Sequence, residues 1–257
     1  MPAVDVERRG AVALLTLNNP PANALGTPVL TALAEAIEAL AADDARAVVV
    51  TGAGRFFSAG LDLFEVAKLV GSPDAEAFAR RFDGLVTGLF ALEKPVVAAI
   101  NGHAIAGGAV LAATADFRLV ADAELKIGVT EIQVGVVYPT SALEVVRFAC
   151  AGPHLAELLY RGNTYGPADA VVRRLADEVV PAGELLDRAL ALAAELGEHR
   201  PLAFASSKRA LRAEHLARIR AASGGGIDPV WRTWQTPDAM QAIFAYRERT
   251  LKKKSGG

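Results

Sequence analysis

The fold follows from two glycine-containing segments: Phe-Ser-Ala-Gly-Leu-Asp-Leu at residues 57–63 and Asn-Gly-His-Ala-Ile-Ala-Gly-Gly-Ala at residues 101–109. Each comes after a run that is apolar on both faces, 47–51 and 95–100, which is the pattern of a buried parallel strand. Small residues there let a ligand approach backbone N–H groups, and N–H groups at a helix start have no partner within the helix. Two such turns side by side would form an oxyanion hole, whereas either turn alone is explained by tight packing of a helix on a strand.

The residues around these segments alternate between strands and helices. Residues 4–17 predict a β-hairpin with its turn at Arg9-Gly10, and Thr27 followed by Pro28 predicts the N-cap of a helix. A second helical pattern covers 74–92, and helical patterns fill most of the chain after Thr140. Strands that alternate with helices early, followed by helices alone, predict an α/β fold with a helical C-terminal region.

The last part of the chain has two strong helix starts, Arg200-Pro201 and Thr236-Pro237. Between them, Ser223-Gly224-Gly225-Gly226 predicts a flexible break. The C-terminal helices are amphipathic, so we expect them either to pack on the core or to form a subunit interface.

The composition indicates a soluble protein with a sizeable core. The chain has 257 residues, 52% of them hydrophobic, which allows one large domain or two small ones. No apolar run reaches the roughly 18 to 20 residues that cross a bilayer, and the N-terminus lacks a signal-peptide pattern, so we expect a cytoplasmic protein with no membrane partner. A net charge of −2 gives no reason to expect a nucleic acid as partner. The single cysteine, Cys150, lies in an apolar segment, which favours packing over a nucleophilic role.

Several common types of site lack the residues that they need. Gly52-Ala53-Gly54 follows a buried strand, but the third glycine of a dinucleotide motif would fall at the bulky Phe57. The chain has no Gly-x-Ser-x-Gly nucleophile elbow, and its 4 histidines are scattered without metal-ligand spacing. We therefore expect neither a metal nor a redox cofactor.

Both glycine-containing segments resemble signatures of the crotonase (enoyl-CoA hydratase/isomerase) superfamily. Residues 57–63 are similar to the first signature, and residues 94–108, with 115–118 after them, are similar to the second, in the family's order and at its separation. Residues 19–25 extend the resemblance, which covers roughly residues 4 to 200.

The resemblance implies a fold and an assembly. The fold would be a crotonase-like (ClpP/crotonase) spiral of repeated ββα units, with a catalytic core at 1–199. Residues 200–257 would form a C-terminal helical region for trimerisation and for covering the active site. The implied substrate is an acyl-CoA or enoyl-CoA, a coenzyme A thioester, handled by a homotrimer or a dimer of trimers without a further cofactor.

Carried over position by position, the resemblance implies that the N–H groups of Ala59 and Gly107 bind the thioester oxygen. Abstraction of a proton beside a thioester places negative charge on that oxygen, and each fixed donor there is typically worth about 3 to 4 kcal/mol. The residues implied to line the CoA arm are Ala22, Ala24, Leu25, Gly60, Leu61, Asp62 and Leu63.

The hydratases of this family resemble one another in using two glutamates, which hold a water molecule between them. In this chain the first position falls on Val110 and the second on Glu131. One carboxylate in an apolar pocket has a raised pKa and can carry a proton between two carbons, but adding water needs a second polar group. The layout therefore resembles the Δ3,Δ2-enoyl-CoA isomerases, in which a single glutamate moves a proton from C2 to C4.

Three other carboxylates have structural interpretations. Asp62 is expected to cap or brace its turn, with a role in proton transfer as the alternative. Asp116, next to Arg118, is expected to be structural, and Glu144 is expected to face solvent on the following helix.

Three alternatives stay open for the function. The first is a hydratase or other lyase of the same family, in which an unidentified residue holds water. The second is an acyl-CoA-binding module with weak or no turnover. The third is a nucleic-acid binder, suggested by Lys252–Lys254 and by RNA-binding members of the family, against which the acidic net charge argues.

Overall fold

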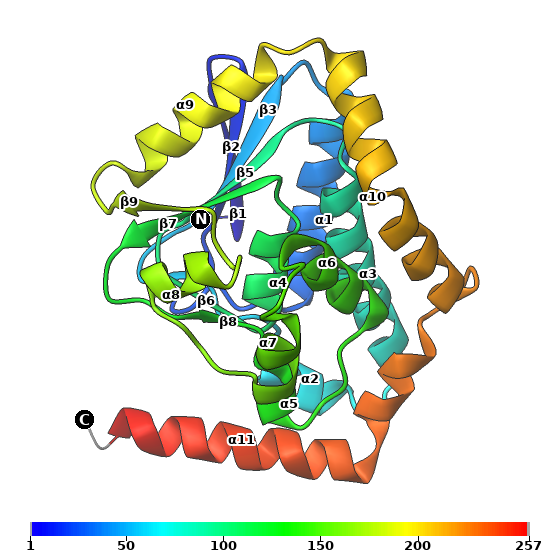
Figure 1. The fold of residues 1–257 in the computed structure, drawn as a ribbon. Coiled ribbons are helices and arrows are strands. Elements are labelled where there is room, and N and C mark those ends of the chain that lie inside the picture. Colours follow the sequence, from blue (N-terminus) through cyan, green and yellow to red (C-terminus); the bar gives the residue numbers. More distant parts are fainter. Residues whose placement is uncertain (1, 256–257) are drawn as a thin grey trace.

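The computed structural model describes residues 2–255, which form two β-sheets surrounded by helices (Figure 1). Within these residues the larger sheet has 6 strands, in the order β1 (Val4–Arg9), β2 (Val12–Leu17), β3 (Ala47–Gly52), β5 (Val96–Ile100), β7 (Phe117–Asp122) and β9 (Glu178–Pro181). The predicted β1–β2 hairpin is confirmed, and all later pairs are parallel. The apolar runs in β3 and β5 are buried as predicted, and the pairing of Val50 with Ala98 brings the carboxyl ends of both strands to the same edge.

A smaller parallel sheet lies after the glycine turns. Its strands follow the order β4 (Phe56–Ser58), β6 (His103–Ile105) and β8 (Ile127–Gly128). Each comes after a strand of the larger sheet and before a helix, so the chain repeats a ββα unit, as expected. Gly52 and Gly102 permit the close crossings, because a Cβ atom there would lie 2.3 Å and 2.2 Å from the backbone oxygens of Phe56 and Arg55.

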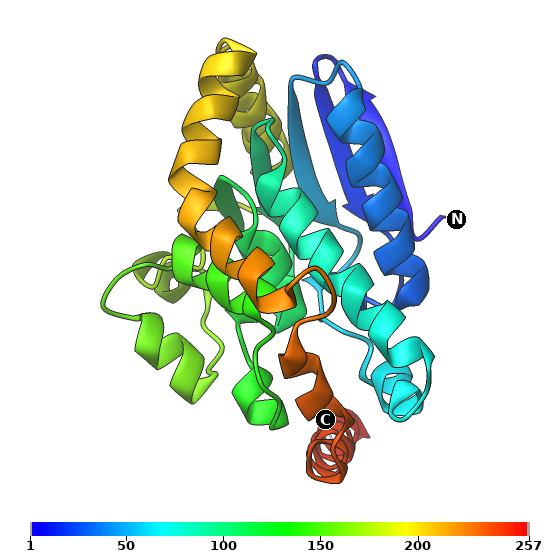
Figure 2. The same ribbon diagram turned by 90° about the vertical axis from the view of Figure 1, so that its right-hand side faces the viewer.

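Long helices cover the larger sheet. Figure 2 shows α1 (Thr27–Ala42) and α3 (Asp74–Ala91) side by side, with α10 (Pro201–Ser223) next to α3. On the sheet itself, α9 (Leu185–Gly197) packs against β3 and β5. The N-cap prediction for α1 was wrong by one residue: Gly26 is the N-cap, and the Thr27 N–H and hydroxyl both donate to the Glu65 carboxylate.

Shorter helices complete the core. Every residue of α4 (Gly107–Ala113) is buried, and α6 (Thr140–Ala149) packs against both α4 and α10. The other short helices that the structure describes are α2 (Leu63–Leu69), α5 (Glu131–Val134), α7 (Leu155–Arg161) and α8 (Pro167–Val172).

The C-terminal helices begin and break at the residues predicted from the sequence. Helix α10 begins at Pro201, ends at the left-handed Gly224 and is followed by the 3-10 helix η1 (Pro229–Gln235) and by α11 (Pro237–Ser255). Helix α11 runs beneath α2 and α5 at the bottom of Figure 1 and contacts both. The side chains of Lys252–Lys254 lie outside the described part of the chain.

A buried ion-pair cluster, which we call the α10 anchor, consists of Asp116, Lys208 and Arg212. Asp116 Oδ2 accepts from Lys208 Nζ at 2.7 Å and from the Val96 N–H at 2.8 Å, and Oδ1 accepts from the Arg212 guanidinium at 2.7 Å. The structural interpretation of Asp116 is therefore confirmed, and its pairing ties the C-terminal region to the core.

Two expectations from the composition have an outcome in the structure. Cys150 is buried, and its burial raises the pKa of the thiol to about 11, which confirms packing as its role. None of the helices formed by residues 2–255 is long and apolar enough to cross a membrane.

Candidate active site

Two backbone N–H groups meet where the glycine turns come together. Gly60 has φ +83°, and a Cβ atom on it would lie 2.8 Å from the nitrogen of Gly107, while a Cβ atom on Gly107 would lie 3.5 Å from the nitrogen of Leu61. Across residues 2–255, no acceptor is hydrogen-bonded to the N–H of Leu61 or of Gly107. These two groups, which we call the donor pair, are therefore free to bind one ligand oxygen.

The expectation that Ala59 supplies one donor was wrong. Its N–H donates to the carbonyl oxygen of Ala22 at 3.0 Å, because residues 22–25 run alongside this turn. In the adjacent parallel bridge Leu25 lies opposite Leu61, and Leu25 bonds through its N–H to Gly60 at 2.8 Å and through its oxygen to Asp62 at 3.3 Å. The bridge leaves the Leu61 N–H without an acceptor, so Leu61 rather than Ala59 is the candidate donor of this turn.

Two side chains that the sequence interpretation did not single out fix the first turn. The Asn23 amide, buried and at φ +50°, donates to the carbonyl oxygens of Ala53 at 3.0 Å and Phe56 at 2.8 Å. The Ser58 hydroxyl donates to the Asn23 carbonyl at 2.8 Å and accepts from the Gly60 N–H at 3.2 Å. Both residues lie within the motifs at 19–25 and 57–63, but the motifs alone do not reveal that their side chains brace the turn.

The second turn is held just as tightly. Gly107 is the first residue of α4, and Ala106 before it has the left-handed φ of +49°, which is strained for a residue with a side chain. A Cβ atom on Gly108 would lie 2.1 Å from the carbonyl oxygen of Ser58, so this glycine lets α4 pack directly on β4. Strain and close packing together preset the position of the Gly107 N–H.

Glu131 is the buried carboxylate that follows the second glycine turn most closely along the chain. It begins α5, is 5% exposed, and its Oε2 is among the few buried side-chain atoms of the described residues without a hydrogen-bond partner. Burial raises the pKa of this carboxyl to about 7, although the backbone N–H groups near it oppose the rise. The group can therefore both accept and release a proton near neutral pH.

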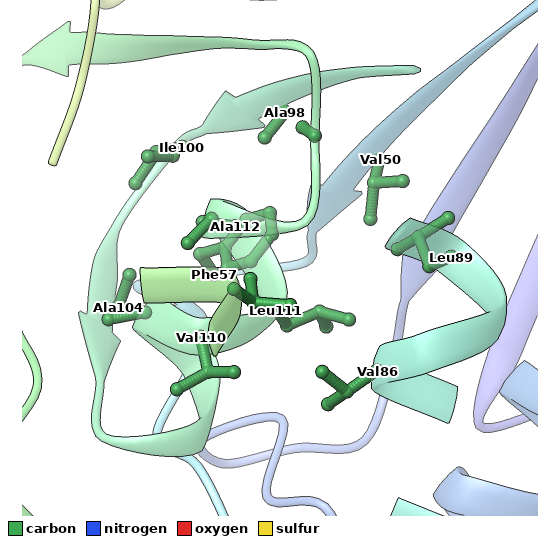
Figure 3. Packing of buried hydrophobic residues seen from close by; sticks show 14 of the residues in the cluster. Val50, Phe57, Val86, Leu89, Ala98, Ile100, Ala104, Val110, Leu111 and Ala112 are labelled. Carbon is green, nitrogen blue, oxygen red and sulfur yellow. The ribbon is translucent and has the colours of Figure 1, made fainter. Parts of the chain in front are cut away.

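Val110 stands where a second carboxylate would be needed to hold water. It is fully buried in α4, and Figure 3 shows it among apolar side chains that include Phe57, Val86 and Ala104. Such a position offers water no hydrogen bond.

A small cavity of about 50 Å³ joins the donor pair to the C-terminal region. Leu61, Gly107 and Thr130 line it, together with Trp234 of η1 and Tyr246 of α11. Two hydrogen bonds hold η1 in place: Trp231 Nε1 donates to Asp83 Oδ2 at 2.7 Å, and Trp234 Nε1 donates to the Val137 oxygen at 2.9 Å. Neither tryptophan nor Tyr246 was singled out from the sequence, because a lining formed by distant residues leaves no local pattern.

The residues predicted to line the CoA arm have different environments. Asp62 is the N-cap of α2, accepting from the N–H groups of Phe64 at 2.8 Å and Glu65 at 3.2 Å, so the capping interpretation is confirmed. Leu25 is fully buried in the core, and its side chain is not accessible to CoA. For Ala22, Ala24, Gly60, Leu61 and Leu63, contact with CoA stays a prediction.

A second, larger cavity of the described chain lies away from the donor pair. A groove of about 770 Å³ lies between α1, α3 and α10, but it is largely apolar, and its Lys94 and Glu93 are paired with Asp43 and Arg209. Among residues 2–255, the side chains of His, Cys, Asp and Glu form no group of 3 or more that could hold a metal ion.

Known proteins are similar to this chain over almost its full length. Residues 7–253 match the sequence pattern of the enoyl-CoA hydratase/isomerase family. The carnitinyl-CoA dehydratase of Escherichia coli strain K12 is 34% identical over 253 residues, which is 96% of each chain. The crystal structure of human mitochondrial Δ3-Δ2-enoyl-CoA isomerase superposes with a TM-score of 0.91 at 29% identity and covers 99% of this chain and 100% of that one. An enoyl-CoA hydratase from Mycobacterium marinum superposes with a TM-score of 0.80 at 30% identity, covering 87% and 97%.

Proposed function

Because this chain belongs to the enoyl-CoA hydratase/isomerase family, we propose that it converts a 3-enoyl-CoA into a 2-enoyl-CoA, using Glu131 as its only proton carrier. The thioester oxygen is bound between the N–H groups of Leu61 and Gly107. The observation that supports the proposal is the contrast between two buried positions: Oε2 of Glu131 has no partner in the described chain, and Val110 is apolar. No metal or redox cofactor takes part in the proposed reaction.

The proposed reaction consists of two proton transfers on one face of the substrate. Glu131 takes a proton from C2, and the electron pair spreads through the adjacent double bond and the thioester, so that negative charge develops on the thioester oxygen. The donor pair stabilises this charge, each donor by about 3 to 4 kcal/mol. Protonated Glu131 then returns the proton to C4, which leaves the double bond between C2 and C3.

The raised pKa of Glu131 suits both halves of this cycle. With a pKa of about 7, the ligand-free enzyme holds a large share of the carboxylate form near neutral pH, and its conjugate acid is strong enough to return the proton. A surface glutamate would be a weaker base, because its pKa lies near 4.3.

An assay of two substrates tests the proposal. We expect purified protein to convert 3-enoyl-CoA into the conjugated 2-enoyl-CoA, followed by the ultraviolet absorbance of the conjugated thioester. Glu131→Gln keeps the shape of the side chain but accepts no proton, so kcat falls by about 10²–10⁴ while KM changes little. Wild-type turnover that survives in Glu131→Gln would disprove the assigned base.

Binding is tested separately from turnover. Any ligand that binds only the folded protein raises its melting temperature by mass action, so acyl-CoA should raise the Tm of both wild type and Glu131→Gln, and more than free CoA does. Absence of any shift across short to long acyl chains at millimolar concentration would remove the basis of the proposal.

The proposed assembly is a homotrimer or a dimer of trimers formed by the C-terminal region, in an intracellular, cytoplasmic setting. Two exposed leucines on α10, Leu202 and Leu211, support a role of this helix in assembly. Light scattering on the purified protein measures the mass directly, and a monomer would contradict the proposal.

A further inference from the structure

Unpaired buried polar atoms occur at the start of α5, where Thr130 lines the cavity. Among the described residues, the buried side-chain atoms without a hydrogen-bond partner are Arg118 Nε, Thr130 Oγ1 and Glu131 Oε2. Two of them belong to consecutive residues at the start of α5, and Thr130, which is 4% exposed, lines the cavity together with Leu61 and Gly107. Since the large majority of buried polar atoms in folded proteins are hydrogen-bonded, these two unpaired atoms indicate a binding site for a polar ligand or a water molecule.

Among the described residues, no neighbouring protein group pairs with these two atoms. The Tyr138 hydroxyl donates to the carbonyl oxygens of Leu159 at 3.1 Å and Val129 at 3.3 Å. Val110 is apolar, and Asp62 is engaged as the N-cap of α2. Within residues 2–255 both atoms are therefore free to bind an oxygen atom of a ligand or of water.

We propose that Thr130 Oγ1 and Glu131 Oε2 together hold one oxygen atom, either of water or of the 3-hydroxyl of a 3-hydroxyacyl-CoA, and that Thr130 thereby gives the site a secondary hydration activity. This inference rests on the proposed function, since it needs Glu131 as the proton carrier and the donor pair on the thioester oxygen. A cavity of about 50 Å³ has room for a water molecule, which needs two to four polar partners.

The hydration step balances with Glu131 alone. The Thr130 hydroxyl donates to the water oxygen, and that water donates to the Glu131 carboxylate. As a lone pair of the water oxygen forms a bond to C3, one water proton passes to Glu131, and the electron pair of the C2–C3 double bond moves toward the thioester oxygen. Protonated Glu131 then delivers its proton to C2 as that electron pair returns, so H and OH have been added and the glutamate is regenerated.

The role of Thr130 in this step is to position the oxygen. A threonine hydroxyl at neutral pH donates and accepts hydrogen bonds but does not act as a base, so it replaces only the orienting part of a second carboxylate. Hydration is therefore slower than isomerisation, which needs no water.

The test compares Thr130→Val with Thr130→Ser. Valine keeps the shape of threonine without the hydroxyl, whereas serine keeps the hydroxyl. With 2-enoyl-CoA and 3-enoyl-CoA in parallel assays, Thr130→Val lowers the ratio of hydration to isomerisation by about tenfold or more, chiefly through the kcat of hydration, and Thr130→Ser retains most of it. The reverse reaction with 3-hydroxyacyl-CoA shows whether the substrate hydroxyl uses the same two groups.

Thr114→Val is the matched control. Thr114 is also buried, but its hydroxyl donates to the Leu111 oxygen at 2.6 Å. Its valine variant should lower the Tm and leave the reaction ratio unchanged, whereas Thr130→Val should not lower the Tm, because the Thr130 hydroxyl has no partner to lose.

The outcomes separate the two proposals. An unchanged ratio in Thr130→Val, or a wild type that hydrates no faster than this variant, overturns the role of Thr130. Loss of isomerisation in every variant, including wild type, overturns the proposed function while a hydration that depends on Thr130 would still stand.

Discussion

The cavity beside the donor pair and the α10 anchor both bury polar groups, but only in the anchor do these groups find hydrogen-bond partners within residues 2–255. In the anchor, Asp116 accepts from a lysine, an arginine and a backbone N–H. At the cavity, Thr130 Oγ1 and the N–H groups of the donor pair have no partner within the described chain, and neither has Oε2 of the next residue, Glu131. Taking an ionised group out of water costs several kcal/mol unless pairing offsets the loss, so the cavity end keeps an energetic penalty that the anchor avoids.

The difference teaches that pairing, rather than burial, separates a structural carboxylate from a chemical one. Burial raises the pKa of Glu131 to about 7, since no cation stands beside it. In the anchor, burial lowers the pKa of Lys208 to about 8 even though Asp116 opposes the change. The anchor uses its charges to fix α10, while the cavity end leaves its groups free for a ligand.

Asp116→Ala should break the α10 anchor and cause the largest loss in the free energy of unfolding. It leaves Lys208 and Arg212 buried without their carboxylate, and removing one partner of a buried pair typically destabilises by about 3 to 5 kcal/mol. Urea denaturation measures the free energy of unfolding. Asp44→Ala is the control, because Asp44 is exposed and forms a surface ion pair with Arg8, so its loss should stay below about 1 kcal/mol. Equal losses in the two variants would show that the anchor does not hold α10.

Gly107→Ala should lower turnover by disturbing the donor pair, while leaving the α10 anchor intact. The new Cβ atom would lie 3.5 Å from the Leu61 nitrogen and 3.4 Å from Phe82, where the thioester oxygen is proposed to bind. We expect kcat to fall by about 10²–10³, the usual effect of losing one oxyanion donor. Gly84→Ala in α3, where a Cβ atom meets nothing within 4 Å, should keep full activity and gain up to about 1 kcal/mol of stability. Normal turnover in Gly107→Ala would move the oxyanion site elsewhere.

Glu131→Gln should stabilise the protein at alkaline pH, the opposite of the change expected at Asp116. The folded pKa of about 7 lies above the ordinary glutamate value of 4.5, so the folded state holds its proton more tightly and stability falls as pH rises between these values. Above pH 7 the carboxylate penalty is about 3 kcal/mol, and glutamine removes it. The advantage of the variant in urea denaturation should shrink as pH falls and vanish below the unfolded pKa. A constant difference at all pH values would contradict an ionisable, unpaired Glu131.

The pH profile of turnover gives the smallest effect and tests the same group in the ligand-free enzyme. Because the base must be deprotonated, kcat/KM for 3-enoyl-CoA should level off above about pH 7 and fall about tenfold for each pH unit below it. A profile whose break lies near pH 4 to 5 would indicate an ordinary solvated carboxylate as the base.

The sequence predicted the parts of the fold that have their own periodicity. The apolar run at 47–51 and the prolines at 201 and 237 each mark an element that the structure contains. The strands β4, β6 and β8 have only two or three residues, which is too short for a hydrophobic period. They form because the glycine turns redirect the chain, which is a tertiary effect.

The candidate site shows the same division. The motifs located Glu131 and Gly107, but the choice between Ala59 and Leu61 depends on which N–H the 22–25 segment occupies, and no local pattern encodes that pairing. Glu144 was expected to face solvent but is 2% exposed, because α10 passes over it and brings His215 at 2.8 Å and Arg218 at 3.2 Å.

The position of η1 beside the cavity has a spectroscopic consequence. The chain has 2 tryptophans, Trp231 and Trp234, and both lie in η1, with their rings 5.0 Å apart. Intrinsic tryptophan emission therefore arises entirely from η1, whose Trp234 lines the cavity, with no background from the sheets. When an acyl group displaces the indole of Trp234 or excludes solvent from it, the emission spectrum changes without any label. The protein thus carries its own fluorophore in the lining of its candidate active site.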